Sequence, residues 1–417
     1  MDVLELYPPA KSTAPSLDNI IGNGAWMLGK TKLSSFLLRV KPSESVDFQT
    51  AWNPRGDGYQ GHEVAVVVAA ATAAYDCVDI AIGTDKNGSI RRPAQCNGLF
   101  GLRPSRESFR WKAFSPSSRI FSRNLGKLSV FAETWYGEGK SRMKQKNLPM
   151  AIVVPVDLFP SEDSLSKQLV PKLIEDLENH LEVEAQRIGM SEIWKQQPPQ
   201  AAAGESLHEN AHFDRHVGWR EYIPDENYHS TAGFRDDYLK KFDRSPFSSP
   251  FVTWKFGKQY TAEQHEEGMW RMNLHEEWFL QTVMQVDTAN TLVVVQSENA
   301  KPNYRDGPPP WDAYYIQSAW HQWWISPILG APEIIIPVRQ IRYESRISSQ
   351  TEYLPVTASI MGPPDMDVTL IGVTKFLMKD TGWPLVANSG KTSRFTLFDT
   401  SLLLTAGQGI LSDINPR

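Results

Sequence analysis

One serine lies in a segment whose residue types can support nucleophilic catalysis. Ser89 belongs to GTDKNGSIRRPA (83–94) and directly follows Gly88, a short distance after an apolar run. A serine hydroxyl is a poor nucleophile until a neighbouring base accepts its proton. The glycine lets the backbone turn sharply, so that successive N–H groups can hold the oxyanion of a tetrahedral intermediate. Ser89 is therefore a candidate nucleophile, provided that a base lies near it.

Two charged residues flank this turn. Asp85 lies four residues before Ser89, and Arg91 lies two residues after it. A carboxylate and a guanidinium form a charge-assisted hydrogen bond, which is stronger than a neutral one. We expect the Asp85–Arg91 pair to hold the loop together.

The composition excludes several classes of function. The chain has 417 residues, enough for one large domain or two ordinary ones, and a net charge of −5 that gives no reason to expect nucleic acid or an anionic membrane as partner. Two cysteines, Cys77 and Cys96, rule out a disulfide scaffold and a four-cysteine zinc site. The longest apolar run, residues 64–75, is shorter than the roughly 20 residues that cross a bilayer. No signal peptide is visible, so we expect a soluble, cytoplasmic protein without a cofactor.

Helical and strand patterns alternate along the chain, which favours an α/β fold with a largely buried mixed sheet covered by helices. Residues 17–36 predict a short helix followed by a buried strand through Trp26, Met27 and Leu28, and residues 64–75 predict a buried helix. Apolar strands are expected at CVDIAIG, PMAIVVPVDLF, TLVVVQ and EIIIPVR, and a helix at LSKQLVPKLIEDLENHLEVEAQ. The glycines of NGLFGLRPS (97–105) indicate close backbone packing.

The chain resembles the amidase signature family, and especially its fungal members, from about residue 6 to about residue 385. The stretch GTDKNGSIRRPAQCNGLFGLRPS (83–105) carries the resemblance, and GKTKLSSF, NPRGDGYQ and IMGPPDMD agree with it. The resemblance implies one large domain over residues 1–387, with a helical, tryptophan-rich middle region at about 110–300. Residues 388–417 stay unassigned.

The same resemblance implies a serine amidase that acts on a small-molecule amide and is linked to secondary metabolism, with Ser89 as nucleophile. It places the oxyanion donors around Lys86, Asn87 and Gly88, although Asn87 stands where the family more often has glycine. The family uses a second serine and a lysine to accept the proton, which is a variant of triad chemistry. The oligomeric state does not follow from it.

This sequence departs from the family at both proton-accepting positions. An ungapped comparison back from Ser89 puts Ala65 at the position of the relay serine, and alanine has no hydroxyl. The family lysine precedes the part that resembles LELYPPA, and Lys11, Lys30 and Lys32 do not match it. Loss of a triad member costs several powers of ten in rate. An impaired enzyme of the same fold, shortened at its start, that binds a ligand or partner is therefore the alternative.

Two further motifs have competing interpretations. HENAH matches the zinc pattern H-E-x-x-H, with His208 and His212 as ligands and Glu209 as base. Its flanks lack the apolar run that would bury such a helix, and no third ligand follows a glycine turn. We interpret it as a solvated helix, expect no metal, and keep a zinc hydrolase as a weaker alternative. WHQWW (320–324) either lines an aromatic pocket near the substrate or packs in the core.

Overall fold

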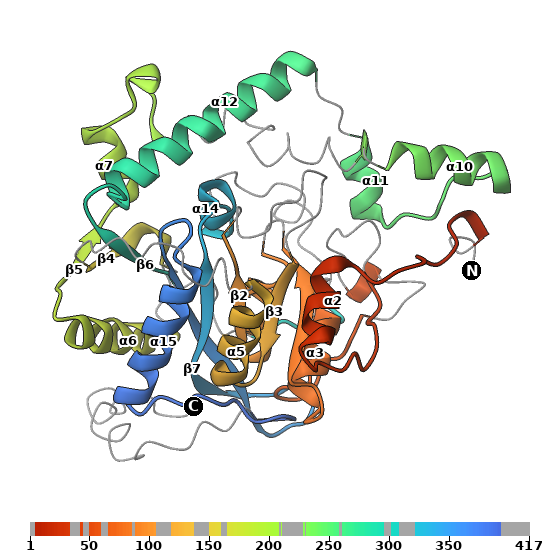
Figure 1. Cartoon of the computed structure of the whole chain (residues 1–417), viewed down its shortest axis with the longest axis horizontal. Helices are drawn as coiled ribbons and strands as arrows, with labels where there is room; N and C mark the ends of the chain where they lie inside the picture. Colours follow the sequence, from red (N-terminus) through yellow and green to blue (C-terminus); the bar gives the residue numbers. More distant parts are fainter. Residues whose placement is uncertain are drawn as a thin grey trace, which may run out of the picture.

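The chain is built around one mixed β-sheet, seen in a computed structural model (Figure 1). The structure describes residues 5–33, 42–44, 50–59, 66–85, 88–105, 118–136, 150–159, 165–207, 210, 228–229, 231–257, 261–295, 302–307 and 322–392. Within these described residues, the sheet has eight strands in the order β1-β3-β2-β7-β8-β6-β4-β5. They are β1 (Ile80–Thr84), β2 (Phe100–Arg103), β3 (Ser118–Ser122), β4 (Met150–Pro155), β5 (Ala185–Ile188), β6 (Asn290–Val295), β7 (Glu333–Glu344) and β8 (Thr351–Met361).

Strand direction divides the sheet into two parts. Strand β4 pairs in parallel with β5 and β6, whereas the pairings from β6 through β8, β7, β2 and β3 to β1 are antiparallel. The predicted α/β class with a central mixed sheet is confirmed. Strands overlap all four apolar stretches that predicted them, and the predicted helices at residues 64–75 and 165–186 correspond to α3 and α6.

Helices cover both faces of the sheet (Figure 1). The α-helices among the described residues are α2 (Pro15–Gly22), α3 (Val66–Ala74), α4 (Arg91–Asn97), α5 (Leu125–Tyr136), α6 (Leu165–Leu181), α7 (Met190–Gln196), α10 (Ala232–Phe242), α11 (Pro250–Phe256), α12 (Ala262–Trp278), α14 (Gln322–Leu329) and α15 (Asp367–Asp380). Short 3-10 turns occupy Pro42–Glu44, Val156–Leu158 and Gln200–Ala202, and a π-helical turn occupies Phe279–Val283.

Alternate residues of each strand point to opposite faces, and each face has its own apolar cluster. Ile334 and Ile336 of β7 join the cluster formed with α5, α6 and α15. Ile335, between them, joins the cluster formed with α3 and α4 on the other face. On that other face, β4 and β6 pack against α7, α12 and α14. Burial on both faces explains why these strands read as continuous apolar runs.

The predicted buried strand through Trp26, Met27 and Leu28 is wrong. Helix α2 ends before this segment, and the side chain of Trp26 is 90% exposed. The segment belongs to no strand of the described sheet. An apolar run becomes a buried strand only where a neighbour supplies backbone hydrogen bonds and a face to cover it, and the run itself does not reveal that neighbour.

The first residues of the unassigned C-terminal segment are held by the NPRGDG loop. The buried Arg55 donates through Nη1 to the backbone oxygens of Asn388 and Gly390, each at 2.8 Å. The Gly56 amide donates to the oxygen of Lys391 at 3.1 Å. Residues 388–392 therefore continue the contacts of the domain, while the boundary at residue 387 stays a prediction.

Among the described residues, no helix combines the length and the apolar character needed to cross a membrane.

We predict that Gly101→Ala destabilises the protein. A Cβ at this position in β2 would lie 2.6 Å from the Cβ of Ala94 in α4, so the helix would be pushed from the sheet. Overpacking of this kind costs about 1–3 kcal/mol. Urea unfolding measures the change. Gly372→Ala in α15 is the control, because nothing lies within 4 Å of its Cβ, and it should be neutral or stabilising. Equal free energies of unfolding for both variants would contradict the prediction.

A second prediction concerns His275, which is fully buried against Trp194 and Trp278. Burial lowers the pKa of His275 to about 3, whereas an unfolded histidine has a pKa near ~6.5. The unfolded state therefore binds the proton first, and stability is lost as the pH falls from about 6.5 toward 3. His275→Phe should lose less stability over this interval, which unfolding curves at several pH values measure. Parallel losses in the two proteins would show that His275 is not the source.

Candidate functional site

Asp85 organises the turn that carries Ser89. It follows β1 directly, and its side chain accepts hydrogen bonds from three backbone amides of the same turn. The Gly88 amide donates to Oδ1 at 2.6 Å, and the amides of Ile90 and Arg91 donate to Oδ2 at 3.1 and 3.3 Å. One carboxylate therefore fixes the backbone on both sides of Ser89.

Gly88 is required by both conformation and space. Its φ of +95° lies in the left-handed region that residues with a Cβ rarely adopt. A Cβ there would also approach the ring of Trp323 to 3.2 Å. The sharp glycine turn expected before Ser89 agrees with this geometry, and the structure adds that Trp323 covers the turn.

The predicted charge-assisted hydrogen bond between Asp85 and Arg91 is present. The Arg91 Nε donates to Oδ2 of Asp85 at 3.1 Å, and Nη2 donates to Oδ1 at 3.2 Å. Nη2 also donates to the backbone oxygen of Trp323 at 2.8 Å, and Nη1 donates to Glu333 Oε2 at 2.8 Å. The Arg91 guanidinium is completely buried, so these contacts replace its water.

The charges around Asp85 keep it ionised. Burial by itself would raise the pKa of Asp85, but the positive charges of Arg91 and Arg119 outweigh burial and hold this pKa well below its usual value. Arg119 donates from Nε and Nη2 to the backbone oxygen of Asp85, at 3.0 and 2.6 Å. Because both side-chain oxygens of Asp85 already accept hydrogen bonds and its basicity is low, Asp85 is a structural anion and a poor proton acceptor.

Ser89 differs from its neighbours in exposure. Gly88 and Ile90 are buried, whereas Ser89 is partly exposed. Its amide is also not among the three that Asp85 binds in this turn. The turn therefore presents one accessible hydroxyl on a backbone whose neighbouring amides are fixed.

Several candidates from the sequence lie outside the described residues. These are Lys86, Asn87, the relay position Ala65, and the zinc-pattern residues His208, Glu209 and His212. The structure brings together Asp85, Gly88, Ser89 and Arg91 only. Lys11, Lys30 and Lys32 are all exposed. Within the described residues, no group of three or more potential metal ligands gathers.

The sequence did not point to three residues of this cluster: Arg119, Trp323 and Glu333. Trp323 stands out in the sequence only as part of the aromatic run WHQWW, and the structure buries it beside Gly88. Glu333 opens the otherwise apolar strand EIIIPVR, and it is 1% exposed. A lone carboxylate at the start of a buried strand is the signal that could have found it, because such a charge needs a partner.

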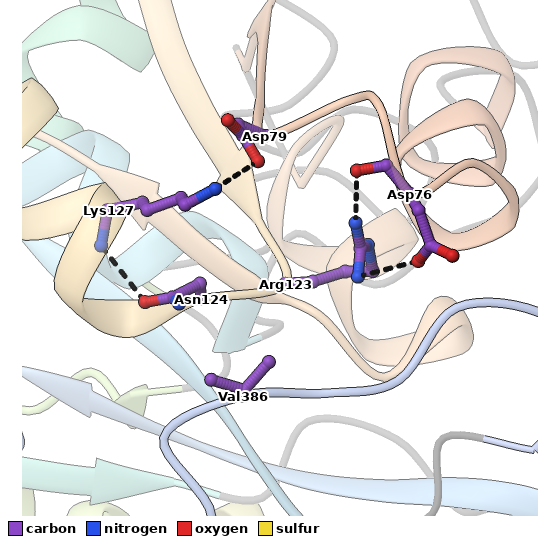
Figure 2. Close-up of a pocket in the computed structure, with 6 residues that line it drawn as sticks. All are labelled: Asp76, Asp79, Arg123, Asn124, Lys127 and Val386. Carbon is purple, nitrogen blue, oxygen red and sulfur yellow. Dashed lines mark hydrogen bonds and ion pairs between the residues drawn. The ribbon is translucent and has the colours of Figure 1, made fainter.

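An open pocket lies at the opposite end of β1 from the Ser89 turn. Figure 2 shows Lys127 directed at Asp79 and Arg123 directed at Asp76, with Asn124 and Val386 completing the lining. The two ion pairs have N–O distances of 2.5 and 3.4 Å. Asp79 precedes the strand and Asp85 follows it, so at strand geometry they are roughly 20 Å apart. This pocket is separate from the candidate site, and its charges are already paired.

Comparisons with known proteins agree with the sequence resemblance. A family model described as Amidase matches residues 2–111. Amidase 1 of Oryza sativa subsp. japonica is 30% identical over 174 residues, which are 39% of this chain and 38% of the rice protein. Amidase 1 of Arabidopsis thaliana is 30% identical over 166 residues, which are 38% of this chain and 37% of that protein. The matches thus span less than two fifths of these relatives.

Solved structures extend the likeness to the whole fold. A 6-aminohexanoate cyclic dimer hydrolase has a TM-score of 0.63 at 14% identity, covering 92% of this chain and 80% of its own. A bacterial aryl acylamidase described as an amidase signature enzyme has a TM-score of 0.62 at 14% identity, covering 90% and 76%. The chain therefore resembles amidases in sequence over residues 2–111 and in fold over most of its length. Fungal origin, a link to secondary metabolism and a cytoplasmic location stay predictions.

We predict that Asp85→Asn lowers the free energy of unfolding by about 3–5 kcal/mol at neutral pH, because it leaves buried guanidinium charge uncompensated. The control is Asp79→Asn at the other end of β1, where both partners are about half exposed, and its cost should be below about 1 kcal/mol. Urea unfolding of both variants measures the difference.

A comparison of Asp85→Asn with the wild type also has a pH signature. The folded pKa of Asp85 is depressed, so its contribution is present above the unfolded value near ~3.9 and is lost as the pH falls toward the folded pKa. Asp85→Asn should therefore lose less stability than the wild type below about pH 4. Equal acid sensitivity of the two proteins would contradict the assignment of Asp85 as an ionised anchor.

Proposed function

We propose that this protein is an amide hydrolase that cleaves the C–N bond of a small amide, with Ser89 as the nucleophile. The observation that carries the proposal is the Ser89 turn, in which Asp85 binds the amides of Gly88, Ile90 and Arg91 and leaves the partly exposed Ser89 outside this set. The match of residues 2–111 to the family model described as Amidase supports the reaction class.

In the proposed reaction, the Ser89 Oγ forms a bond to the amide carbon while its proton passes to a base. The carbonyl oxygen becomes an oxyanion. By the family resemblance, backbone amides at Lys86, Asn87 and Ser89 would stabilise it. The C–N bond then breaks, and the departing amine takes up the proton. Water attacks the resulting acyl ester, releases the acid and restores the Ser89 hydroxyl.

The base is not part of the cluster beneath the turn. Asp85 and Glu333 each accept hydrogen bonds on both side-chain oxygens, and Arg91 is bound on Nε, Nη1 and Nη2. These residues hold the turn in place rather than move a proton. In this reaction the proton acceptor must therefore approach Ser89 from its exposed side.

A protein of the same fold that binds an amide-like ligand or a partner with little turnover is the second candidate. It is favoured by Ala65, which occupies the relay position in the family resemblance and has no hydroxyl to pass a proton. The two candidates differ in whether Ser89 reacts covalently, so one chemical test separates them.

We predict that a fluorophosphonate serine probe labels the folded protein once and that Ser89→Ala abolishes the adduct. Labelling requires an activated serine, and intact mass spectrometry reads its stoichiometry. Ser191→Ala, an exposed serine on α7, is the matched control and should label like the wild type. Unlabelled protein should also hydrolyse some members of a panel of primary amides and anilides. A folded wild type that takes up no probe would overturn the hydrolase proposal in favour of the ligand-binding one.

A further inference from the structure

We propose that Glu333 is a positioning residue for the Ser89 turn, acting through Arg91. Its importance for catalysis rests on the proposed function of Ser89, whereas its effect on the geometry of the turn does not. Glu333 is 242 residues from Arg91 in the chain, and it lies outside the motif at 83–105 that carries the family resemblance.

Glu333 is the first residue of β7, and both of its side-chain oxygens are occupied. Oε2 accepts the Arg91 Nη1 hydrogen bond at 2.8 Å and the Ser326 hydroxyl at 2.5 Å. Oε1 accepts the Ser359 hydroxyl at 2.7 Å. All of these partners are buried, so the carboxylate is held by α14 through Ser326 and by β8 through Ser359.

The fixed carboxylate sets the position of Arg91. A guanidinium is planar and presents its N–H groups in a rigid fork, so fixing two of its edges fixes the whole group. Asp85 is bound along the Nε and Nη2 edge, and Glu333 is bound at Nη1. Because the guanidinium is rigid, the position of Glu333 sets the orientation of Arg91. Arg91 in turn sets where the Asp85 carboxylate accepts hydrogen bonds from the backbone amides of the turn.

The balance of charge also depends on Glu333. Arg91, Arg103 and Arg119 are all buried beneath the turn. Burial is the main cause that lowers the pKa of Arg103 well below its ordinary value. The charges of Arg119 and Arg91 lower it further, whereas those of Asp85 and Glu333 raise it. Asp85 and Glu333 both form ion pairs with Arg91, so a neutral residue at 333 would remove one of these two counter-ions.

A purely structural role for Glu333 makes a different prediction. If Glu333 only joins β7 to α14 and β8, its loss should lower the overall stability and leave the turn ordered in the molecules that remain folded. If it positions Arg91, its loss should disorder the turn selectively. Hydrogen exchange of a peptide covering residues 85–97, compared with one covering β4, separates the two.

The test uses Glu333→Gln, which keeps the size and removes the charge. The control is Glu352→Gln on the neighbouring strand β8. Glu352 is also buried and also binds a cation, Lys391 at 2.5 Å, but it pairs with Tyr343, ten residues along β7 from Glu333. We expect Glu333→Gln to accelerate exchange in the 85–97 peptide only, and to slow probe labelling of Ser89 per folded molecule by about 10- to 100-fold. Glu352→Gln should change neither. Glu333→Asp, which keeps the charge, should recover part of the labelling rate.

Exchange in the 85–97 peptide that is the same in Glu333→Gln and Glu352→Gln would overturn the inference. If Glu333→Gln does not fold, Ser359→Ala is the second variant, because it removes one of the three hydrogen bonds to Glu333. It should accelerate exchange in the same peptide by a smaller amount. Unchanged exchange in this peptide would also overturn the inference. A wild type that takes up no probe would refute the proposed function alone, because the exchange comparison still decides the role of Glu333.

Discussion

The burial of the Arg91 guanidinium is the constraint on which the site depends. A charge removed from water must be matched by partners in fixed places, and removal of one partner of a buried pair is strongly destabilising. Arg91 meets this requirement with Asp85 from its own turn, Glu333 from β7 and the backbone of Trp323 from α14. The Ser89 turn can therefore keep its shape only when the sheet and α14 are assembled around it.

Close packing of α4 on the sheet makes these contacts reachable. Gly101 of β2 has no side chain, so Ala94 of α4 can pack directly against the strand. A Cβ on Gly101 would lie 2.6 Å from the Cβ of Ala94. Ile90 and Ala94 join Ile335 in one apolar cluster beside the turn. Because β7 alternates between faces, this packing also places the start of the strand, Glu333, beneath Arg91. The apolar contacts bring the charges together, and the charges then fix the orientation of the turn.

This arrangement separates two tasks that a serine hydrolase needs. Asp85, Arg91 and Glu333 hold the backbone, and their charges are fully engaged with one another. In the proposed reaction, the proton of Ser89 must then be accepted by a group outside this cluster. A protein that kept the buried cluster and lost its base would retain the fold and the shape of the turn while losing turnover, which is why covalent reactivity, rather than structure, separates the two proposed functions.

Local sequence determined the elements that depend on neighbouring residues. Apolar runs predicted β1, β4, β6 and β7. The opposite charges of Asp85 and Arg91, six residues apart in the chain, predicted their hydrogen bond. The strand expected at Trp26 failed because a strand exists only with a partner. Glu333, Trp323 and Arg119 reach the turn from 34 to 242 residues away. Only the tertiary structure placed them there, since a buried charge in the sequence shows that a partner is required and does not show which distant residue supplies it.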